Sequence, residues 1–486
     1  MHKIRKLMLA TPNCTWLNLR PWQIPPYTLG LLRAVIDDTA YEVEILDANL
    51  ENLTFEQVRN RVHAFGPDLV GVSTMSLEYA KSGHKMIELV KHVDPQILTV
   101  MGGVYGTISP EMAIHDPNLD FVILGEGERR FPKLLNILNE KSPDFSDFDG
   151  LAYRSQSQVV INPIKTYIED LDSLPFPAYD KVNFTMFFKQ SNKFSNVLLP
   201  RYYPYTITST SRGCPFNCIY CSTHAIDGKR IRYKSAERVL EEIDWLVREY
   251  GIKEIIFLDD NLVLNRERFV NILKGLIARD YDLFWKSVNL ATFMLDEEIL
   301  ALMKESKTYQ IILPIESGNQ HVLSNILKKP LDLTKVPAII DKAKSLDLEI
   351  AADFIIGVPG ETWDQIQDTI RFAEAIDVDM VSFHIATPLP KTALYELAKE
   401  RGNLDMAFDV NNLFGFGRGH ITTDQFTPKS LHTLRATEWA RINFATQHKR
   451  QRFANMAGIS LEELETWRQK TLEHAGIFFP EASFQK

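Results

Sequence analysis

Residues 211–221 read Ser-Arg-Gly-Cys-Pro-Phe-Asn-Cys-Ile-Tyr-Cys, which sets Cys214, Cys218 and Cys221 in the spacing CxxxCxxC. The chain has only four cysteines, and three so close together make a poor framework for disulfides. The same spacing lets one loop fold around a cuboidal iron–sulfur cluster and present three thiolates to three irons. The remaining iron then lacks a protein ligand and stays open to a substrate or cosubstrate. We therefore predict a 4Fe-4S cluster on these three cysteines.

A structural zinc ion is the alternative to a cluster in this loop. Zinc usually takes four ligands in paired CxxC-like spacings, and the nearest fourth candidate here is His224. A loop between a strand and a helix is an unusual place for such a site, so the iron–sulfur cluster is favoured. The fourth cysteine, Cys14, is predicted to be a partly buried small apolar residue.

The cysteine loop follows the first strand of a region in which short apolar runs alternate with amphipathic segments. Six β/α units of this kind predict a parallel, partly closed barrel with its chemistry at the carboxyl ends of the strands. The predicted strands are Tyr205–Thr208, Glu254–Leu258, Trp285–Asn289, Gln310–Pro314, Glu349–Ile356 and Met380–Ile385. The clearest helices are Ala236–Tyr250, Arg266–Asp280 and Thr362–Ala375.

The N-terminal residues show a second alternating pattern, which predicts a doubly wound parallel α/β sheet. Ligands of such sheets bind beyond the carboxyl ends of the strands, where polar and Gly-rich tips here indicate a large ligand. A GxGxxG fingerprint after the first strand is missing, so no dinucleotide site is expected. The strands are Ile4–Ala10, Tyr41–Leu46, Leu69–Ser73, Ile97–Met101 and Phe121–Leu124, with helices at Phe55–Phe65 and Tyr79–His92. The tips are Thr11–Asn13, Ser73–Ser76, Gly102–Thr107 and Gly125–Glu128.

These patterns divide the chain into four parts. Residues 1–143 form the doubly wound domain, 144–203 an irregular connector lying over the surface, 204–419 the barrel, and 420–486 a helical C-terminal region. Trp439, Arg441 and Trp467 of that region are expected to pack over the barrel mouth together with Arg418. Helical amphipathicity explains most of this region without any ligand.

Composition limits the classes of partner. The 486 residues carry a net charge of −9 and no long basic run, which argues against a nucleic-acid partner. No apolar stretch is long enough to span a membrane and the N-terminus has no secretory pattern, so a cytoplasmic protein is expected.

The cysteine loop, with Tyr220 just before its third cysteine, closely resembles the signature of the radical S-adenosylmethionine (SAM) superfamily, and the similarity extends along most of the chain. The resemblance implies that SAM binds the open iron and that an electron, from an external donor of the flavodoxin or ferredoxin type, cleaves it to a 5′-deoxyadenosyl radical. Positions matching by their place in the barrel imply further SAM-binding residues: Tyr220, Asp259, Asp260, Asn261, Glu316, Ser317, Ile356 and Gly357. Residues 388–395 resemble the family's PGTPLY segment, with Lys391 where glycine is common.

The N-terminal domain resembles the cobalamin-binding domain of cobalamin-dependent radical SAM enzymes. The resemblance rests on Pro25–Leu32, on the GGxxxTxxPE-like turn from Gly102 to Glu111, and on the Gly125–Glu128 turn. It implies a cobalamin site that includes Ser73, Thr74, Met75, Ser76, Leu77, Gly102, Gly103, Tyr105, Thr107, Gly125 and Glu126. Met75, Ser76 and Leu77 would approach the lower face of cobalt, because the chain has no DxHxxG histidine motif. Trp16, Trp22 and Tyr105 could pack on the corrin, although local packing is the more common role of such aromatic residues.

Taken together, the two resemblances imply a methyltransferase that acts on an unactivated carbon of a small molecule or natural product, through the 5′-deoxyadenosyl radical and methylcobalamin. The same cofactors could instead serve cyclisation, oxidation or rearrangement without methyl transfer. A non-catalytic corrinoid or iron–sulfur carrier or sensor is the alternative from another class. The sequence names no catalytic residue and no substrate.

Overall fold

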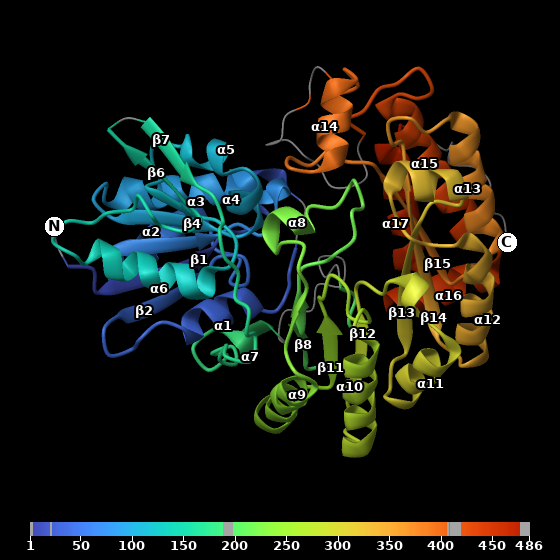
Figure 1. The fold of residues 1–486 in the computed structure, drawn as a ribbon, viewed down its shortest axis with the longest axis horizontal. Helices are drawn as coiled ribbons and strands as arrows, with labels where there is room; N and C mark the ends of the chain where they lie inside the picture. Colours follow the sequence, from blue (N-terminus) through green and yellow to red (C-terminus); the bar gives the residue numbers. More distant parts are fainter. Residues whose placement is uncertain are drawn as a thin grey trace.

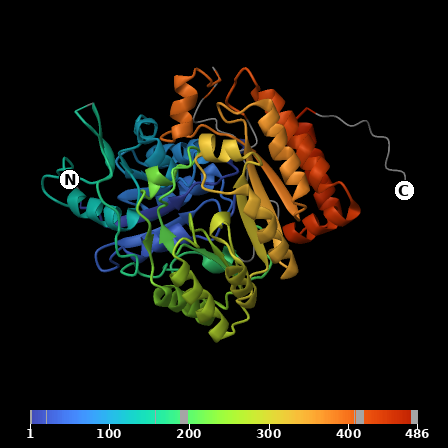
Figure 2. The same cartoon turned by 45° about the vertical axis from the view of Figure 1, so that its right-hand side comes forward.

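The structure is a computed structural model, which describes residues 3–19, 22–156, 158–187, 198–405, 408 and 419–476. Arg418 lies outside the described residues. Two α/β halves lie side by side, and the C-terminal helices pack on the far side of the second half (Figures 1 and 2). In the described part of the chain, no helix combines the length and the apolar character needed to cross a membrane.

The first half is built on a seven-stranded sheet in the order β2-β1-β3-β4-β5-β6-β7, parallel from β2 to β5. This order confirms the predicted doubly wound sheet. The strands are β1 (Lys6–Thr11), β2 (Glu42–Asp47), β3 (Leu69–Ser73), β4 (Leu98–Gly102), β5 (Phe121–Ile123), β6 (Leu151–Ser155) and β7 (Gln158–Asn162).

Helices cover both faces of this sheet because each contributes one apolar stripe to a buried cluster. Side chains of α1 (Tyr27–Ala34) and α6 (Gly127–Leu138) pack on one face. The other face is covered by α2 (Phe55–Phe65), α3 (Ala80–Val93), α4 (Val104–Ile108) and α5 (Pro110–Ile114). Helix α2 illustrates how local sequence sets the bounds: Thr54 and Gln57 form a capping box, and Gly66 ends the helix at φ 62°.

The segment predicted as an irregular surface connector is more ordered than expected. Its strands β6 and β7 extend the first sheet in antiparallel pairing. It also contains the short helix α7 (Phe184–Phe187), and the Tyr179 ring is buried, stacked on Phe184 and Trp245. Burial of aromatic surface holds this segment between the two halves. The Pro-rich sequence gave no indication of this packing.

The second half carries the six predicted parallel strands in two ladders, β8-β11-β12 and β13-β14-β15, joined by a single bridge between Trp285 and Thr308. The strands are β8 (Tyr205–Thr208), β11 (Glu254–Phe257), β12 (Phe284–Ser287), β13 (Gln310–Glu316), β14 (Glu349–Ile356) and β15 (Met380–Ile385). A small antiparallel pair, β9 (Ser211–Arg212) and β10 (Arg232–Tyr233), flanks the cysteine loop. The helices are α8 (Thr223–Ile226), α9 (Ala236–Tyr250), α10 (Arg266–Arg279), α11 (Glu297–Glu305), α12 (Val336–Ser345), α13 (Trp363–Ala375) and α14 (Ala393–Glu400).

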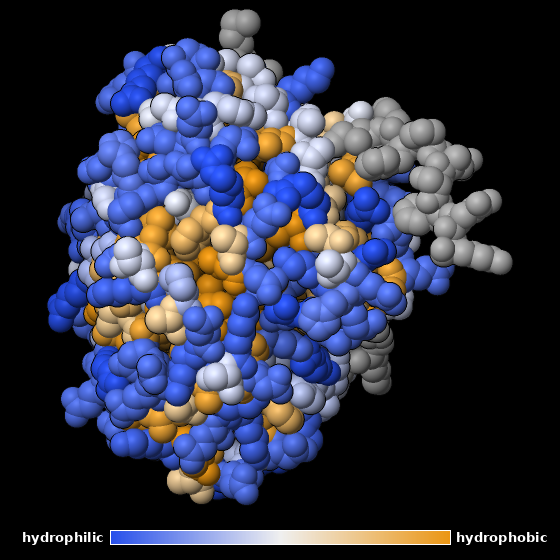
Figure 3. Space-filling model, turned by 90° about the vertical axis from the view of Figure 1, so that its right-hand side faces the viewer, coloured by the Kyte–Doolittle hydropathy of each residue, from blue (hydrophilic) through white to orange (hydrophobic). Residues whose placement is uncertain are grey.

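Three helices close the chain: α15 (Pro428–Asn443), α16 (Gln447–Ala457) and α17 (Leu461–His474). Trp439 and Trp467 pack against each other and against Phe453, so they form the core of this helical layer and do not cover the barrel mouth as predicted. Arg441 pairs with Glu374 and Glu438 at the surface, also away from the mouth. The outer face on this side is mostly hydrophilic, with apolar side chains gathered across its middle (Figure 3).

Candidate functional site

A cavity of about 380 Å³ lies between the two halves, where the carboxyl ends of both sheets face each other. The first half contributes the tips after β3, β4 and β5, and the barrel contributes the segments after β8 and β11. Eight residues predicted from the sequence line it together: Ser73, Met75, Gly102, Gly103, Thr107, Gly125, Glu126 and Asp260. Residues that sequence reasoning did not select also line it, among them Tyr27, Ser211, Arg212 and Asp227.

The tip after β4 approaches the tip after β3 closely enough to require glycine. Gly103 has φ 92°, and a Cβ atom there would lie 2.5 Å from the carbonyl oxygen of Thr74. The side chain of Thr74 is fully buried behind this tip, so it does not line the cavity. At Gly102 a Cβ atom would meet nothing within 4 Å, which leaves room for a ligand beside the backbone.

Tyr105 points away from the cavity, contrary to the expectation that its ring packs on a corrin. The phenol lies 2.9 Å from His84 Nε2, and His84 Nδ1 lies 2.7 Å from Asp116. These three side chains line a separate hollow over α3 and α5. A short helix directly after a turn can direct its side chains to either side, so the sequence did not decide this orientation.

Four other candidates in the first half also face the protein. Trp16 donates its indole N–H to the Leu53 carbonyl, Trp22 packs edge-on against Tyr79, and Leu77 is buried in the core. The hydroxyl of Ser76 is buried and has no hydrogen-bond partner among the described residues. For Trp16 and Trp22, local packing is therefore the interpretation that the structure supports.

The cysteine loop is braced by backbone contacts from three other segments. Gly213 adopts φ 87°, where a Cβ atom would lie 2.6 Å from the Arg230 carbonyl oxygen. Within the loop, the Ile219 N–H donates to the Leu327 carbonyl and the Ile219 carbonyl accepts from the Leu394 N–H. The loop is thus braced by the segment that precedes β10 and by the segments that follow β13 and β15.

The thiols suit a cluster better than a single ion. Burial raises the pKa of Cys214 to about 11 and also raises that of Cys218, so a thiolate here needs positive charge beside it, which a metal centre supplies. Within the described ranges, no three His, Cys, Asp or Glu side chains converge tightly enough to hold one metal ion. A cuboidal cluster instead takes one thiolate at each of three separate irons. His224, the fourth ligand of the zinc alternative, donates its Nε2–H to the Cys214 carbonyl at 2.8 Å.

The three polar residues after β11 have different surroundings. Asp259 is completely buried and accepts hydrogen bonds from the Thr210 N–H and hydroxyl and from Ser211, so it anchors the strand end below the loop. Asp260 lines the cavity and accepts from Thr223, whose hydroxyl in turn accepts from the Cys221 thiol. Burial raises the pKa of Asp260. The Oδ1 atom of Asn261 is buried without a partner among the described residues.

The ends of β13 and β14 lie on the other side of the cysteine loop. Glu316 adopts φ 72°, and its carboxylate accepts from the Tyr220 hydroxyl at 2.9 Å and from Lys329 at 3.1 Å. Ser317 lies within hydrogen-bond distance of Thr369 and so holds its turn. Ile356 is fully buried, and Gly357, at φ 85°, packs under Leu431 of α15. Glu316 contacts the loop directly through Tyr220.

Buried ion pairs join the cysteine loop to the Gly125–Glu128 tip of the first half. Arg212 contacts both Glu126 and Glu128, and Arg232 also contacts Glu126. The Ile168 N–H donates to the same carboxylate at 2.6 Å. Glu126 was predicted as a cofactor-binding residue, but its two oxygens are taken up by this interdomain contact. Arg212, two residues before the first cysteine, is the sequence feature that could have indicated this pairing.

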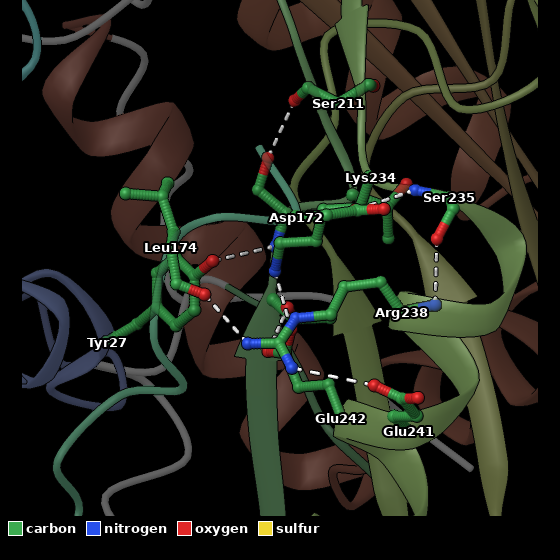
Figure 4. Close-up of polar contacts among 12 residues, drawn as sticks. Tyr27, Asp172, Leu174, Ser211, Lys234, Ser235, Arg238, Glu241 and Glu242 are labelled. Carbon is green, nitrogen blue, oxygen red and sulfur yellow. Dashed lines mark hydrogen bonds and ion pairs between the residues drawn. The ribbon is translucent and has the colours of Figure 1, made fainter. Parts of the chain in front are cut away.

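The β8 side of the loop is supported by a second polar cluster, shown in Figure 4. Glu242 of α9 accepts from Lys234 and from Thr208 at the end of β8. Arg238, on the same helix, donates to the Leu174 carbonyl of the connector at 2.7 Å. Through this cluster, α9 anchors both the connector and β8, the strand that leads into the cysteine loop.

Lys391 occupies the position where the PGTPLY-like segment commonly has glycine. It adopts φ 62°, a conformation that glycine reaches more easily, and its ammonium donates to the Thr107 carbonyl at 2.8 Å. The substitution therefore adds a contact between the barrel and the first half.

Two family models match this chain: the radical SAM superfamily over residues 208–373 and the B12 binding domain over residues 21–135. The sequence is 35% identical to an uncharacterized methyltransferase of Pyrococcus horikoshii, over 77% of this chain and 78% of that protein. It is 30% identical to the cytidylyl-2-hydroxyethylphosphonate methyltransferase of Streptomyces wedmorensis, over 83% of both chains. The fold is similar to that of TsrM from Kitasatospora setae, a radical SAM methyltransferase solved with cobalamin and a [4Fe-4S] cluster, with a TM-score of 0.74, 16% identity and 97% and 99% of the two chains covered.

Proposed function

The chain belongs to the cobalamin-binding radical SAM superfamily, and we propose that it is a methyltransferase that adds a methyl group to an unactivated carbon of a small molecule. The cofactors of this superfamily are a [4Fe-4S] cluster, SAM and cobalamin. When bound, the cluster and SAM supply the radical that removes a substrate hydrogen, and cobalamin supplies the methyl group.

One observation carries the proposal: a single cavity touches both the tips of the B12-binding half and the segments that hold the cysteine loop. A methyltransferase of this kind needs both cofactors within reach of one substrate carbon. Two relatives that are at least 30% identical over most of both chains are named as methyltransferases.

For cobalamin, the chain offers a polar, small-residue surface at the tips after β3 and β4. Ser73, Gly102, Gly103 and Thr107 line the cavity there, and the open space beside Gly102 fits a large group lying against the backbone. Met75 lines the same cavity and is the residue that we assign to the lower face of cobalt. Ser76 and Leu77 face the protein and leave this role to Met75.

For the cluster and SAM, the chain offers three thiols and two carboxylates on opposite sides of one loop. Cys214, Cys218 and Cys221 would hold the cluster, while Asp260 and Glu316 orient the loop through Thr223 and Tyr220. Glu316 is paired with Lys329, so it can position a cationic amino group without leaving an unpaired buried charge.

Product analysis tests the proposal without knowledge of the substrate's skeleton. The anaerobically reconstituted enzyme, given SAM, a reductant and candidate substrates, should form S-adenosylhomocysteine and 5′-deoxyadenosine in amounts that match the methylated product. Cytidylyl-2-hydroxyethylphosphonate is the first candidate substrate, because the relative from Streptomyces wedmorensis is named for it. Product that forms with 5′-deoxyadenosine but without S-adenosylhomocysteine would mean cyclisation, oxidation or rearrangement. Formation of neither nucleoside would favour a carrier or sensor.

Two further expectations belong to this proposal. The electron that cleaves SAM comes from an external flavodoxin or ferredoxin, and the enzyme works in the cytoplasm. Reduction of the reconstituted cluster by a purified flavodoxin system, compared with reduction by dithionite, tests the expected electron donor.

A further inference from the structure

Helix α15 lies along β15 and contacts the barrel near both of its ends. Leu431, near the start of the helix, contacts the Gly357 turn at the carboxyl end of β14. Asn443, at the end, pairs with the backbone N–H and carbonyl of Val381 in β15, at 2.8 and 2.9 Å. Arg435 follows Leu431 by one turn, and its charge acts on His384 in the carboxyl half of β15.

The guanidinium of Arg435 has no partner among the described residues. Its Nε atom is sealed from solvent without a hydrogen bond, and no ion pair joins the group to a described carboxylate. Burial alone lowers its pKa. Arg441 on the same helix shows the contrast, since it is bound by the carboxylates of Glu374 and Glu438. A desolvated, unpaired cation is costly, so a ligand that neutralises it has an advantage at this position.

The strands β14 and β15 direct alternate side chains out of and into the barrel. On β14 and β15, Phe354 and Phe383 pack together, and Phe354 also meets Phe372 of α13, which directs these rings outward. Because side chains alternate along a strand, Asp353 and His384 face the interior.

These two side chains are still 28% and 38% exposed, so the interior is open there. Burial opposes the charged imidazole, but Asp353, 3.6 Å away, raises the pKa of His384 overall, and Arg435 is near enough to oppose that rise. The charge of Glu316 also raises the pKa of His384, and the Glu316 carboxylate accepts a hydrogen bond from Tyr220 of the cysteine loop.

We propose that Arg435, with His384 beside it, binds an oxyanion group of the substrate, a phosphonate, phosphate or carboxylate, at the mouth of the barrel. The planar guanidinium can donate two parallel hydrogen bonds to such a group. The bound anion would fix the substrate next to the loop where hydrogen abstraction takes place. This inference rests on the proposed function, because it names the chemical class of the methyl acceptor.

Direct binding of small oxyanions to the reconstituted enzyme tests the inference without turnover. Methylphosphonate and acetate serve as probes in calorimetry, for wild type, Arg435→Gln, Arg435→Lys and the matched control Arg441→Gln on the same helix. We expect Arg435→Gln to weaken binding of at least one probe by about tenfold or more, since a hydrogen-bonded charge pair is lost. The affinity of Arg435→Lys for the probes should lie between those of wild type and Arg435→Gln, and the affinity of Arg441→Gln should match that of wild type. If the Gln variant does not fold, the Lys variant makes the same comparison.

The affinity for SAM is measured in parallel, because SAM also carries a carboxylate. Unchanged SAM affinity together with lost oxyanion binding supports a substrate site. The inference is overturned if wild type binds neither probe, if Arg435→Gln binds them as wild type does, or if SAM affinity falls with them. None of these results depends on formation of S-adenosylhomocysteine, so failure of the proposed function would be seen separately.

Discussion

The carboxylate of Glu126 lies between Arg212 and Arg232, and we predict that Glu126→Gln weakens the contact between the two halves by about 3 kcal/mol. The Glu126 and Arg232 side chains are only 3% and 2% exposed, so neither charge is solvated by water. Removing one partner of a buried ion pair costs about 3–5 kcal/mol, because the other charge stays buried without compensation. Arg212 keeps Glu128, so the loss falls mainly on Arg232 and the lower end of this range applies.

Urea unfolding followed by tryptophan fluorescence measures this loss. Glu374→Gln is the matched control, since Glu374 pairs with Arg441 at the surface, where both side chains are about half exposed. Such an exposed pair contributes less than about 1 kcal/mol. The free energy of unfolding should therefore fall clearly more for Glu126→Gln than for the control.

A double variant separates loss of charge pairing from loss of packing. Arg232→Met removes the guanidinium that Glu126→Gln leaves unpaired, so the combined variant should be more stable than the two separate losses predict. Equal stability of Glu126→Gln and Glu374→Gln, or losses that simply add in the double variant, would contradict this prediction.

Three more predictions follow from the site. Cys218→Ala should abolish the cluster's iron content and 5′-deoxyadenosine formation while cobalamin binding, read from its absorbance, is kept; full iron content would contradict the cluster assignment. Gly102→Val places its side chain in the open cavity and should lower cobalamin occupancy at unchanged stability. Gly103→Ala meets the Thr74 carbonyl and should instead destabilise the fold itself. Unchanged cobalamin occupancy in Gly102→Val would count against the cobalamin placement. Burial raises the pKa of Glu361 from 4.5 to about 7, so the protonated side chain is favoured in the fold and stability falls as pH rises through this window. Glu361→Gln should remove about 3 kcal/mol of that pH dependence between pH 5 and 8 in urea unfolding, and an unchanged pH profile would contradict it.

Short-range pattern was enough to predict the two sheets and the place of the cluster. Strands with helical crossovers, such as Leu69–Ser73 and Glu349–Ile356, are visible as apolar runs because both faces of a parallel sheet are buried. The spacing of the cysteines indicates a cluster because all three lie on one loop, where sequence distance limits spatial distance. The irregular text of the connector carried no such periodicity, and its strands β6 and β7 were missed.

The apolar pattern of the sequence did not predict the direction of individual side chains. Tyr105 follows a glycine tip that lines the cavity, yet α4 packs on α5 and the Tyr105 phenol meets His84 of α3. Asp259 and Asp260 are adjacent in sequence, but one anchors a strand end and the other lines the cavity, because neighbouring residues at a strand end point to opposite sides.

By itself, the sequence determined the α/β architecture and the cofactors and predicted the three cysteines as cluster ligands, because these depend on residue types at short spacing. The tertiary structure alone decided that Glu126 pairs with Arg212 and Arg232, which lie 86 and 106 residues further along the chain. It also decided that the buried Nε atom of Arg435, on a C-terminal helix, has no hydrogen-bond partner among the described residues. The charge of a buried group is compensated by whatever the fold places beside it, and no local pattern records that neighbour.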